Sequence, residues 1–180
     1  KLSKSRLIVG FNRRFAPYYE LCKSLLSVSS TPSVINIMIN AGVVSKDHWV
    51  NDGGVGGGRI IGEMCHFLDL LIYLTNSFII NFNTKSLLHS SGKNVFVTLK
   101  LENGSIGNIH YITNGNRSFP KERIEIFQSE KIIKINNCKS IQFYGFKDKN
   151  FKFSFIQNKG VKKMIDSILN NNENDQFPTI

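Results

Sequence analysis

The spacing of apolar residues changes at about Phe78, and this change limits the fold more than any other feature of the sequence. Beyond Phe78, apolar and polar residues alternate, as they do in strands that are buried on one face. An Asn-Gly pair within "LENGSIG" is typical of a tight β-hairpin turn, because the pair supplies positive φ angles. The strands that we predict are 79–89, 94–102, 105–113, 121–128, 131–136 and 140–146. The second half of the chain is therefore expected to be mostly antiparallel sheet.

The remaining elements are predicted before Phe78 and near the C-terminus. Apolar residues that recur every three or four positions indicate helices, and alternating ones indicate strands. These elements are a strand at 6–11, a helix at 17–26, a strand at 33–42, a helix at 59–74 and a helix at 158–170. Because strands and helices are segregated along the chain, we predict an α+β fold, an open and mostly antiparallel β-sheet with helices packed on one face.

Composition favours a single globular domain over residues 1–180, since 41% of the residues are hydrophobic and 20% are charged. The net charge of +10 would suit an acidic partner. However, the lysines are scattered and no nucleic-acid-binding signature accompanies them, so nucleic acid is not the expected partner. Three widely spaced cysteines without a C-x-x-C pair indicate neither a disulfide framework nor a zinc ribbon. No apolar run approaches the roughly 20 residues that cross a bilayer, and no signal peptide is recognised, so we expect a cytoplasmic protein without a membrane partner.

A glycine-rich loop precedes the helix at 59–74. Its glycines do not fit the G-x-G-x-x-G phosphate-binding pattern, and no G-K-[ST] follows them. Glycines nevertheless let a backbone approach a ligand closely, and the N–H groups at the start of the next helix have no partner within the helix. Gly57 and Gly58 are therefore candidate ligand contacts. The alternative is a tight structural turn with nothing bound.

The helix at 59–74 carries ionisable residues on an otherwise apolar sequence. At 100° per residue, Glu63 and Asp69 lie about 60° to either side of His66. Buried carboxylates are costly unless they are paired, so these groups are expected to reach a cleft or to orient the imidazole. One alternative is the solvent-facing side of an ordinary amphipathic helix. Another is a zinc-dependent hydrolase that also uses Cys65, although Cys65 points about 100° away from His66.

Two stretches, "VGFNRRFAP" and "NDGGVGGGRIIGEMCHFLDLLIYLTNS", resemble the C-terminal, substrate-side domain of the glucose–fructose oxidoreductase / inositol dehydrogenase / rhizopine catabolism (Gfo/Idh/MocA) family. The resemblance spans essentially the whole chain and rests on G-G-G followed by H-x-x-D. It implies an open antiparallel sheet like those of the C-terminal domains of dihydrodipicolinate reductase and glyceraldehyde-3-phosphate dehydrogenase. It also implies a preceding nucleotide-binding domain, with residues 1–15 as its trailing strand and the hinge, so the chain is expected to be a fragment that is inactive alone.

The chemistry implied by the resemblance is hydride transfer between NAD or NADP and the hydroxyl–carbonyl pair of a sugar, sugar nucleotide or cyclitol. His66 stands at the family's proton-handling position. The family often has an aspartate four residues earlier, where this chain has Gly62, so Glu63 is the candidate orienting carboxylate. Gly57 and Gly58 are the candidate cofactor contacts. The stretch "GGGRIIGEMCHFLDL" is similar to the corresponding stretch of family members that act in surface-polysaccharide and amino-sugar metabolism.

Four residues are candidate substrate contacts. Asn12 and Arg14 match the Asn-Arg-Arg-Phe motif near the cleft, and an arginine could bind an anionic group, the alternative being surface or interdomain pairing. Trp49, the only tryptophan, could stack on a sugar ring or could instead anchor its loop in the core. Asp69 completes the set. A rival hypothesis is a non-catalytic binding or scaffold domain with a basic surface.

A homo-oligomer is expected through the open face of the sheet. In "NVFVTLKL" both alternate sets of side chains keep apolar members, for example Val97 in one set and Phe96 in the other. A sheet face in contact with water normally shows cleaner alternation, so we expect a second copy of the chain to cover it.

Overall fold

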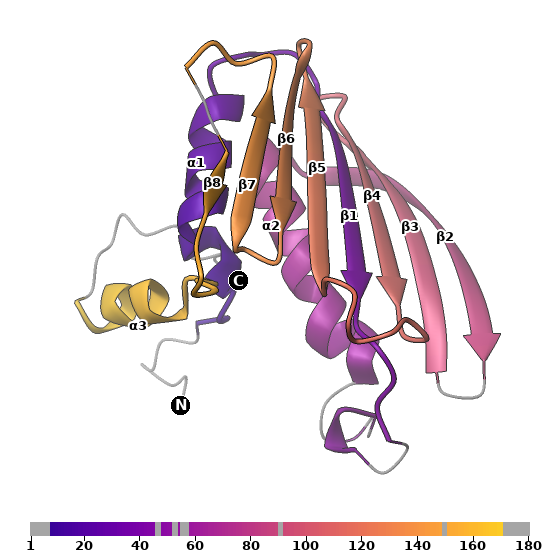
Figure 1. The fold of residues 1–180 in the computed structure, drawn as a ribbon. Helices are drawn as coiled ribbons and strands as arrows, with labels where there is room; N and C mark the ends of the chain where they lie inside the picture. The colour runs from indigo at the N-terminus through magenta and orange to yellow at the C-terminus, as the bar shows by residue number, and fades with distance from the viewer. Residues whose placement is uncertain are drawn as a thin grey trace, which may run out of the picture.

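The computed structural model of the chain describes residues 8–45, 48–51, 54, 58–89, 92–148 and 151–170. Eight strands form one sheet in the order β2-β3-β4-β1-β5-β6-β7-β8 (Figure 1). The strands are β1 (Val34–Asn40), β2 (Ile79–His89), β3 (Gly92–Leu101), β4 (Ile106–Ile112), β5 (Glu122–Gln128), β6 (Lys131–Asn136), β7 (Ser140–Tyr144) and β8 (Lys152–Phe153). Strands β1 and β4 run parallel, whereas the other described neighbours are antiparallel.

The α-helices are α1 (Pro17–Leu26), α2 (Cys65–Thr75) and α3 (Val161–Leu169). Figure 1 shows α1 and α2 on the same side of the sheet. A 3-10 turn at Asn12–Phe15 leads into α1, and a π-helical turn at Ile60–Met64 leads into α2. The predicted α+β fold is thus confirmed. No helix in the described part of the chain is both long and apolar enough to cross a membrane.

The core lies between α1, α2 and one face of the sheet. On β1, Ile35, Ile37 and Ile39 are buried almost completely, as the alternation in the sequence predicts. Helix α2 lies directly on β4, where a β-carbon at Gly107 would meet a methyl group of Leu71 at 2.2 Å. This close approach fixes the height of α2 above the sheet, and with it the positions of the ionisable residues on α2.

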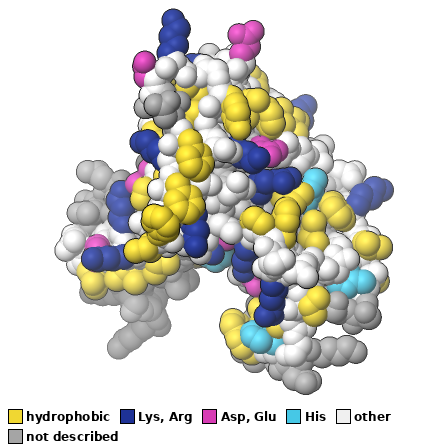
Figure 2. All heavy atoms as spheres, in the orientation of Figure 1, with side chains coloured by type: hydrophobic (Ala, Val, Ile, Leu, Met, Phe, Trp, Pro, Cys, Tyr) yellow, Lys and Arg dark blue, Asp and Glu magenta, His cyan; other side chains and the backbone are white. Residues whose placement is uncertain are grey.

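The open face of the sheet carries polar groups near its centre. Thr98 on β3 donates a hydrogen bond to Asn108 on β4 over 3.0 Å, and Asn108 donates one to Asn36 on β1 over 2.9 Å. Beside them, Phe96 and His110 pack edge to face, 5.3 Å between ring centroids. In the orientation of Figure 2, hydrophobic and charged side chains are interspersed over the visible surface. The open face is therefore more polar than the helix-covered face but retains apolar groups.

The strand predicted at 6–11 is not formed over residues 8–11. The N–H of Phe11 bonds to the carbonyl of Val9, and the N–H of Asn12 bonds to that of Gly10, each over 2.9 Å. These are local turns. A short apolar run becomes a strand only when another strand pairs with it, and no described strand does so here. The two-residue strand β8, conversely, is too short for alternation to reveal it.

Candidate active site

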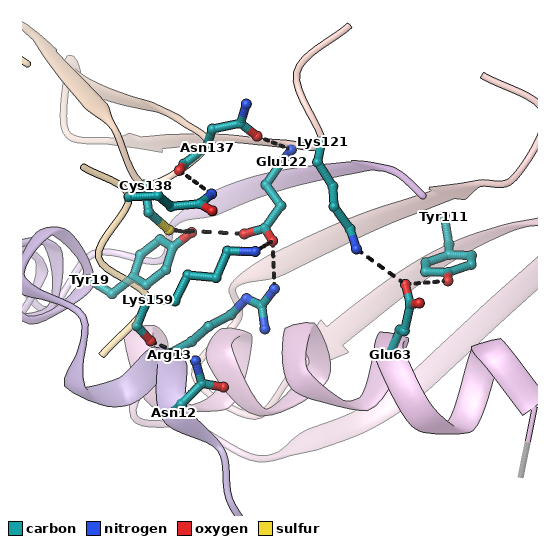
Figure 3. A network of polar contacts seen from close by, with 11 residues as sticks. Asn12, Arg13, Tyr19, Glu63, Tyr111, Lys121, Glu122, Asn137, Cys138 and Lys159 are labelled. Atoms are coloured by element: carbon teal, nitrogen blue, oxygen red, sulfur yellow. Dashed lines mark hydrogen bonds and ion pairs between the residues drawn. The ribbon is translucent and has the colours of Figure 1, made fainter. Parts of the chain in front are cut away.

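Glu63 lies in the π-helical turn before α2, and this turn changes where its side chain points. A π turn contains more residues than an α turn, so the assumption of 100° per residue fails at Glu63. Its carboxylate accepts a 2.7 Å hydrogen bond from the hydroxyl of Tyr111 on β4, and Lys121 lies 3.7 Å away (Figure 3). Burial, and then this hydrogen bond, raise the pKa of Tyr111, which therefore remains a donor. Glu63 is held by the sheet rather than by His66.

His66 occupies the first turn of α2 and is half-buried. Its ring packs edge to face against Phe11 with 5.5 Å between centroids. Its Nδ1 atom is buried and has no hydrogen-bond partner among the described residues. Burial and then the nearby Arg13 lower the pKa of His66, and the carboxylates of Asp69, Glu122 and Glu63 offset this only in part. The imidazole is therefore neutral near pH 7 and able to accept a proton.

A buried charge cluster lies beside His66, and sequence reasoning did not find it. Arg13 donates a 2.7 Å hydrogen bond to Glu122 at the start of β5, and Lys159 lies 3.0 Å from the same oxygen (Figure 3). Glu122 is 1% exposed and Arg13 is 7% exposed. The guanidinium of Arg13 also lies 4.1 Å from the ring of Phe67, the residue after His66. No signal in the sequence links Arg13 to Glu122, because 109 residues separate them.

Lys159 reaches this cluster because its own backbone and Gly160 pack against the Asn-Arg-Arg-Phe turn. The side-chain amide of Asn12 donates a 2.6 Å hydrogen bond to the carbonyl of Lys159. Gly160 follows with a φ of +80°, and a β-carbon there would lie 2.4 Å from the carbonyl oxygen of Asn12. A left-handed conformation and this close approach both require glycine. The side chain of Asn12 therefore makes a structural hydrogen bond within the fold.

Arg14 and Asp69 form a bidentate pair with each other. The Nε and Nη2 groups of Arg14 donate to the two carboxylate oxygens of Asp69, the first over 2.8 Å. Asp69 is buried on α2, and the pair fastens this helix to the turn at Asn12–Phe15. The structure therefore places these two expected substrate contacts against one another.

A cavity of about 840 Å³ opens next to Glu63. Trp49 lies in its lining and is 63% exposed, so the alternative that it anchors its loop in the core is not met. Gly62 is among the described lining residues, and His66, which is not, follows it by one turn of the helix. Gly57 lies outside the described residues. Gly58 has a φ of +77°, and no atom of another described residue lies within 4 Å of its β-carbon position.

A metal centre is not supported by the arrangement of these side chains. In the described ranges, no group of three or more His, Cys, Asp or Glu residues is placed to hold a metal ion. Glu63 and Asp69 instead accept hydrogen bonds from Tyr111 and Arg14. The arrangement can bind a polar ligand in the cavity and exchange a proton at His66.

Comparison with known proteins shows the fold. No family model and no curated protein matches the sequence. Among solved structures, the dehydrogenase MviM from Clostridium difficile is 23% identical, with a TM-score of 0.69 over 92% of this chain and 54% of that one. The super-repressor mutant of Gal80p from Saccharomyces cerevisiae is 17% identical, with a TM-score of 0.71 over 97% and 55%.

The UDP-N-acetylglucosamine 3-dehydrogenase GnnA from Acidithiobacillus ferrooxidans is 16% identical, with a TM-score of 0.67 over 92% of this chain and 54% of that one. The chain thus spans about half the length of the structures that it matches. Its eight-stranded sheet with helices on one face is the fold that these structures share with it over the matched half of their chains.

Proposed function

We propose that this chain is the substrate-binding and catalytic half of an NAD(P)-dependent oxidoreductase, which acts on a hydroxyl or carbonyl of a sugar, sugar nucleotide or cyclitol. The observation that supports it most is His66, with a buried Nδ1 that has no described partner and a lowered pKa. A neutral imidazole accepts a proton as a hydroxyl is oxidised and returns it in the reverse reaction.

Most of the other predicted site residues position either the helix that carries His66 or the wall of the cavity. Arg14 and Asp69 fix α2 against the turn at Asn12–Phe15, and Asn12 fixes the segment that carries Lys159. Glu63 shapes the cavity wall through Tyr111. We assign these groups as positioning residues, because each already has a partner within the fold, and Trp49 as the substrate contact.

The described residues are suited to contact one edge of a dinucleotide cofactor but not to bind the whole cofactor. Among the described residues nothing fills the space at the β-carbon position of Gly58, and a flat group near the start of the helix would fit there. The sequence contains no G-x-G-x-x-G, however, so we propose that a separate nucleotide-binding domain holds most of the cofactor. When bound, the nicotinamide would accept or donate the hydride.

Turnover is the direct test of this proposal. The protein that contains this domain is assayed with NAD and NADP against neutral and charged sugars, sugar nucleotides and inositols, and the absorbance of the reduced nicotinamide is followed. Oxidation of at least one substrate that requires His66 is expected. A protein that reduces neither cofactor with any of them is not the proposed enzyme.

The isolated 180-residue chain is expected to fold without measurable affinity for NAD or NADP, because it lacks the dinucleotide-binding motif. Titration calorimetry measures this directly, and circular dichroism checks that the chain is folded. Micromolar binding of either cofactor to this chain alone would contradict the division of the site between two domains.

A second candidate function is a non-catalytic binding domain. Gal80p, whose super-repressor mutant shares the fold, shows that this architecture also occurs in a repressor. The net charge of +10 would then contribute to an acidic partner's binding. Salt-dependent retention on an acidic matrix together with an absence of turnover would favour this alternative.

The chain is also expected to dimerise through the open face of its sheet, where the apolar Phe96 lies close to the polar groups of Thr98 and Asn108. Light scattering at about 100 μM, above the dissociation constants of stable homodimers, should report a dimer. Thr98→Arg places a charge on this exposed position and should shift the mass to that of a monomer. A wild-type monomer at this concentration would rule the interface out.

A further inference from the structure

The cavity beside Glu63 is lined by more positive than negative charge. Its described lining includes three cations, Arg59, Arg117 and Lys121, and one carboxylate, Glu63. His48 also lines it. A concave site with a net positive charge concentrates anionic ligands and favours them over neutral ones of the same shape.

The three cations differ in the groups that they contact. Both terminal nitrogens of Arg59 donate to backbone carbonyls, to Gly42 over 2.8 Å and to Ala41 over 2.9 Å. Arg117 donates to the carbonyl of Val43 over 2.6 Å. These two arginines hold the segment after β1 in position through neutral carbonyl acceptors. The Nε of Arg59 also lies 3.9 Å from the carboxylate of Glu63, so Arg59 and Lys121 share this one carboxylate. The cavity therefore keeps an excess of positive charge.

Lys121 is the cation that can reach a ligand. Its side chain is 48% exposed, and its ammonium lies 3.7 Å from Glu63, beyond hydrogen-bond distance. Its three donors find no acceptor among the described residues. Glu63 is secured independently by the 2.7 Å hydrogen bond from Tyr111. Lys121 can thus turn toward an anion without breaking the wall of the cavity.

Trp49 supplies the second part of the recognition. An indole that is 63% exposed in the lining of a cavity presents an apolar face on which a sugar ring can pack. His48 lies beside it, with 5.8 Å between ring centroids. The cavity therefore combines a flat apolar surface with a cation that lacks a hydrogen-bonded partner.

We infer that the substrate of this cavity is a sugar that carries an anionic group, a phosphate or a carboxylate, which Lys121 binds while the sugar ring packs on Trp49. This inference rests on the proposed function and narrows its substrate class. Charge-assisted hydrogen bonds to the anion would orient the ring and separate such substrates from neutral polyols.

The test uses Trp49 as its own reporter, because it is the only tryptophan of the chain. The 180-residue chain is titrated with glucose 6-phosphate, glucuronate, glucose, myo-inositol and inorganic phosphate, and tryptophan fluorescence is followed. At least one of the two anionic sugars should bind about 10-fold more tightly than glucose and myo-inositol. The stronger of the two identifies the anion as phosphate or carboxylate.

Lys121→Gln should lower the affinity for that anionic sugar about 10-fold and leave the response to glucose unchanged. Lys163→Gln is the matched control, since Lys163 is 59% exposed and also pairs with a glutamate, Glu20, but lies outside the described lining. It should behave as the wild type.

Several results would overturn the inference. They are equal affinity for charged and neutral sugars, an unchanged affinity in Lys121→Gln, inorganic phosphate binding as tightly as the sugar phosphate, or no fluorescence response to any probe. Because this readout needs no hydride transfer, these results leave the role of His66 untouched. Conversely, a failure of the His66 variant to lose activity would leave the binding result standing.

Discussion

Replacing His66 with alanine in the protein that contains this domain is expected to lower the hydride-transfer rate about 10²-fold or more, as loss of a general acid or base does. The substitution removes the imidazole and with it the proton acceptor. It breaks no hydrogen bond of Nδ1, because this atom of His66 has no hydrogen-bond partner among the described residues. The fold should therefore survive. Single-turnover kinetics of the reduced cofactor measure the rate, and thermal unfolding checks stability.

The pH profile distinguishes a chemical role of His66 from a structural one. Burial and Arg13 lower the pKa of His66, so the neutral form persists below the usual histidine range. In the wild type, oxidation should stay fast on acidification to about pH 6.5 and decline only below it, where the imidazole becomes protonated. His66→Ala should lose this limb of the profile. His110→Ala, on the open face, is the control and should keep both rate and profile. A folded His66→Ala protein with wild-type turnover would remove His66 from the mechanism.

The sheet was predictable because its signals are local. Each strand buries one face. The isoleucines of β1 and the valines and leucines of β3 therefore alternate with other residues, and this alternation is visible in the sequence. The hairpin turn at Asn103 and Gly104 connects β3 and β4 as predicted. Strand order was not predictable in this way. The parallel placement of β1 beside β4 depends on contacts between residues 72 positions apart, for instance Asn36 and Asn108.

The candidate site was predictable only in part, and the reason is again distance along the chain. The helical spacing of His66 and Asp69 indicates a shared region of α2, but not that Arg14 occupies both carboxylate oxygens of Asp69. The direction of Glu63 depends on a π turn, which has no recognisable pattern in the sequence. A resemblance to a family identifies the position of a histidine, whereas the groups that surround and tune it come from tertiary contacts.

Changing Glu122 to glutamine is expected to destabilise the domain by about 3–5 kcal/mol, the usual cost of leaving one partner of a buried ion pair without the other. Glutamine has nearly the same shape, so the change removes charge without creating a cavity. Lys159 is partly exposed and can turn toward water, but Arg13 is 7% exposed and would remain charged beside Phe67. Equilibrium unfolding in urea measures the loss.

The effect of Glu122→Gln should depend on pH, and the sign follows from the ion pairs. Burial alone would raise the pKa of Glu122, but Arg13 and Lys159 outweigh it and hold this pKa below the usual range. The stability that the carboxylate contributes is therefore present above the unfolded-state pKa of about 4.3 and is lost as the pH falls through the lower folded-state value. The difference between wild type and variant should shrink accordingly in acid.

Glu125→Gln, on the same strand, is the matched control for Glu122→Gln. Glu125 pairs with Arg123 at 3.5 Å, and both side chains are about a third exposed, at 29% and 34%. Water screens such a pair, so its loss should cost about 0–1 kcal/mol. If the two glutamine variants differ by less than about 1 kcal/mol at pH 7, the cluster of Arg13, Glu122 and Lys159 does not behave as a buried ion network. The support that it gives to the helix of His66 would then have to come from packing alone.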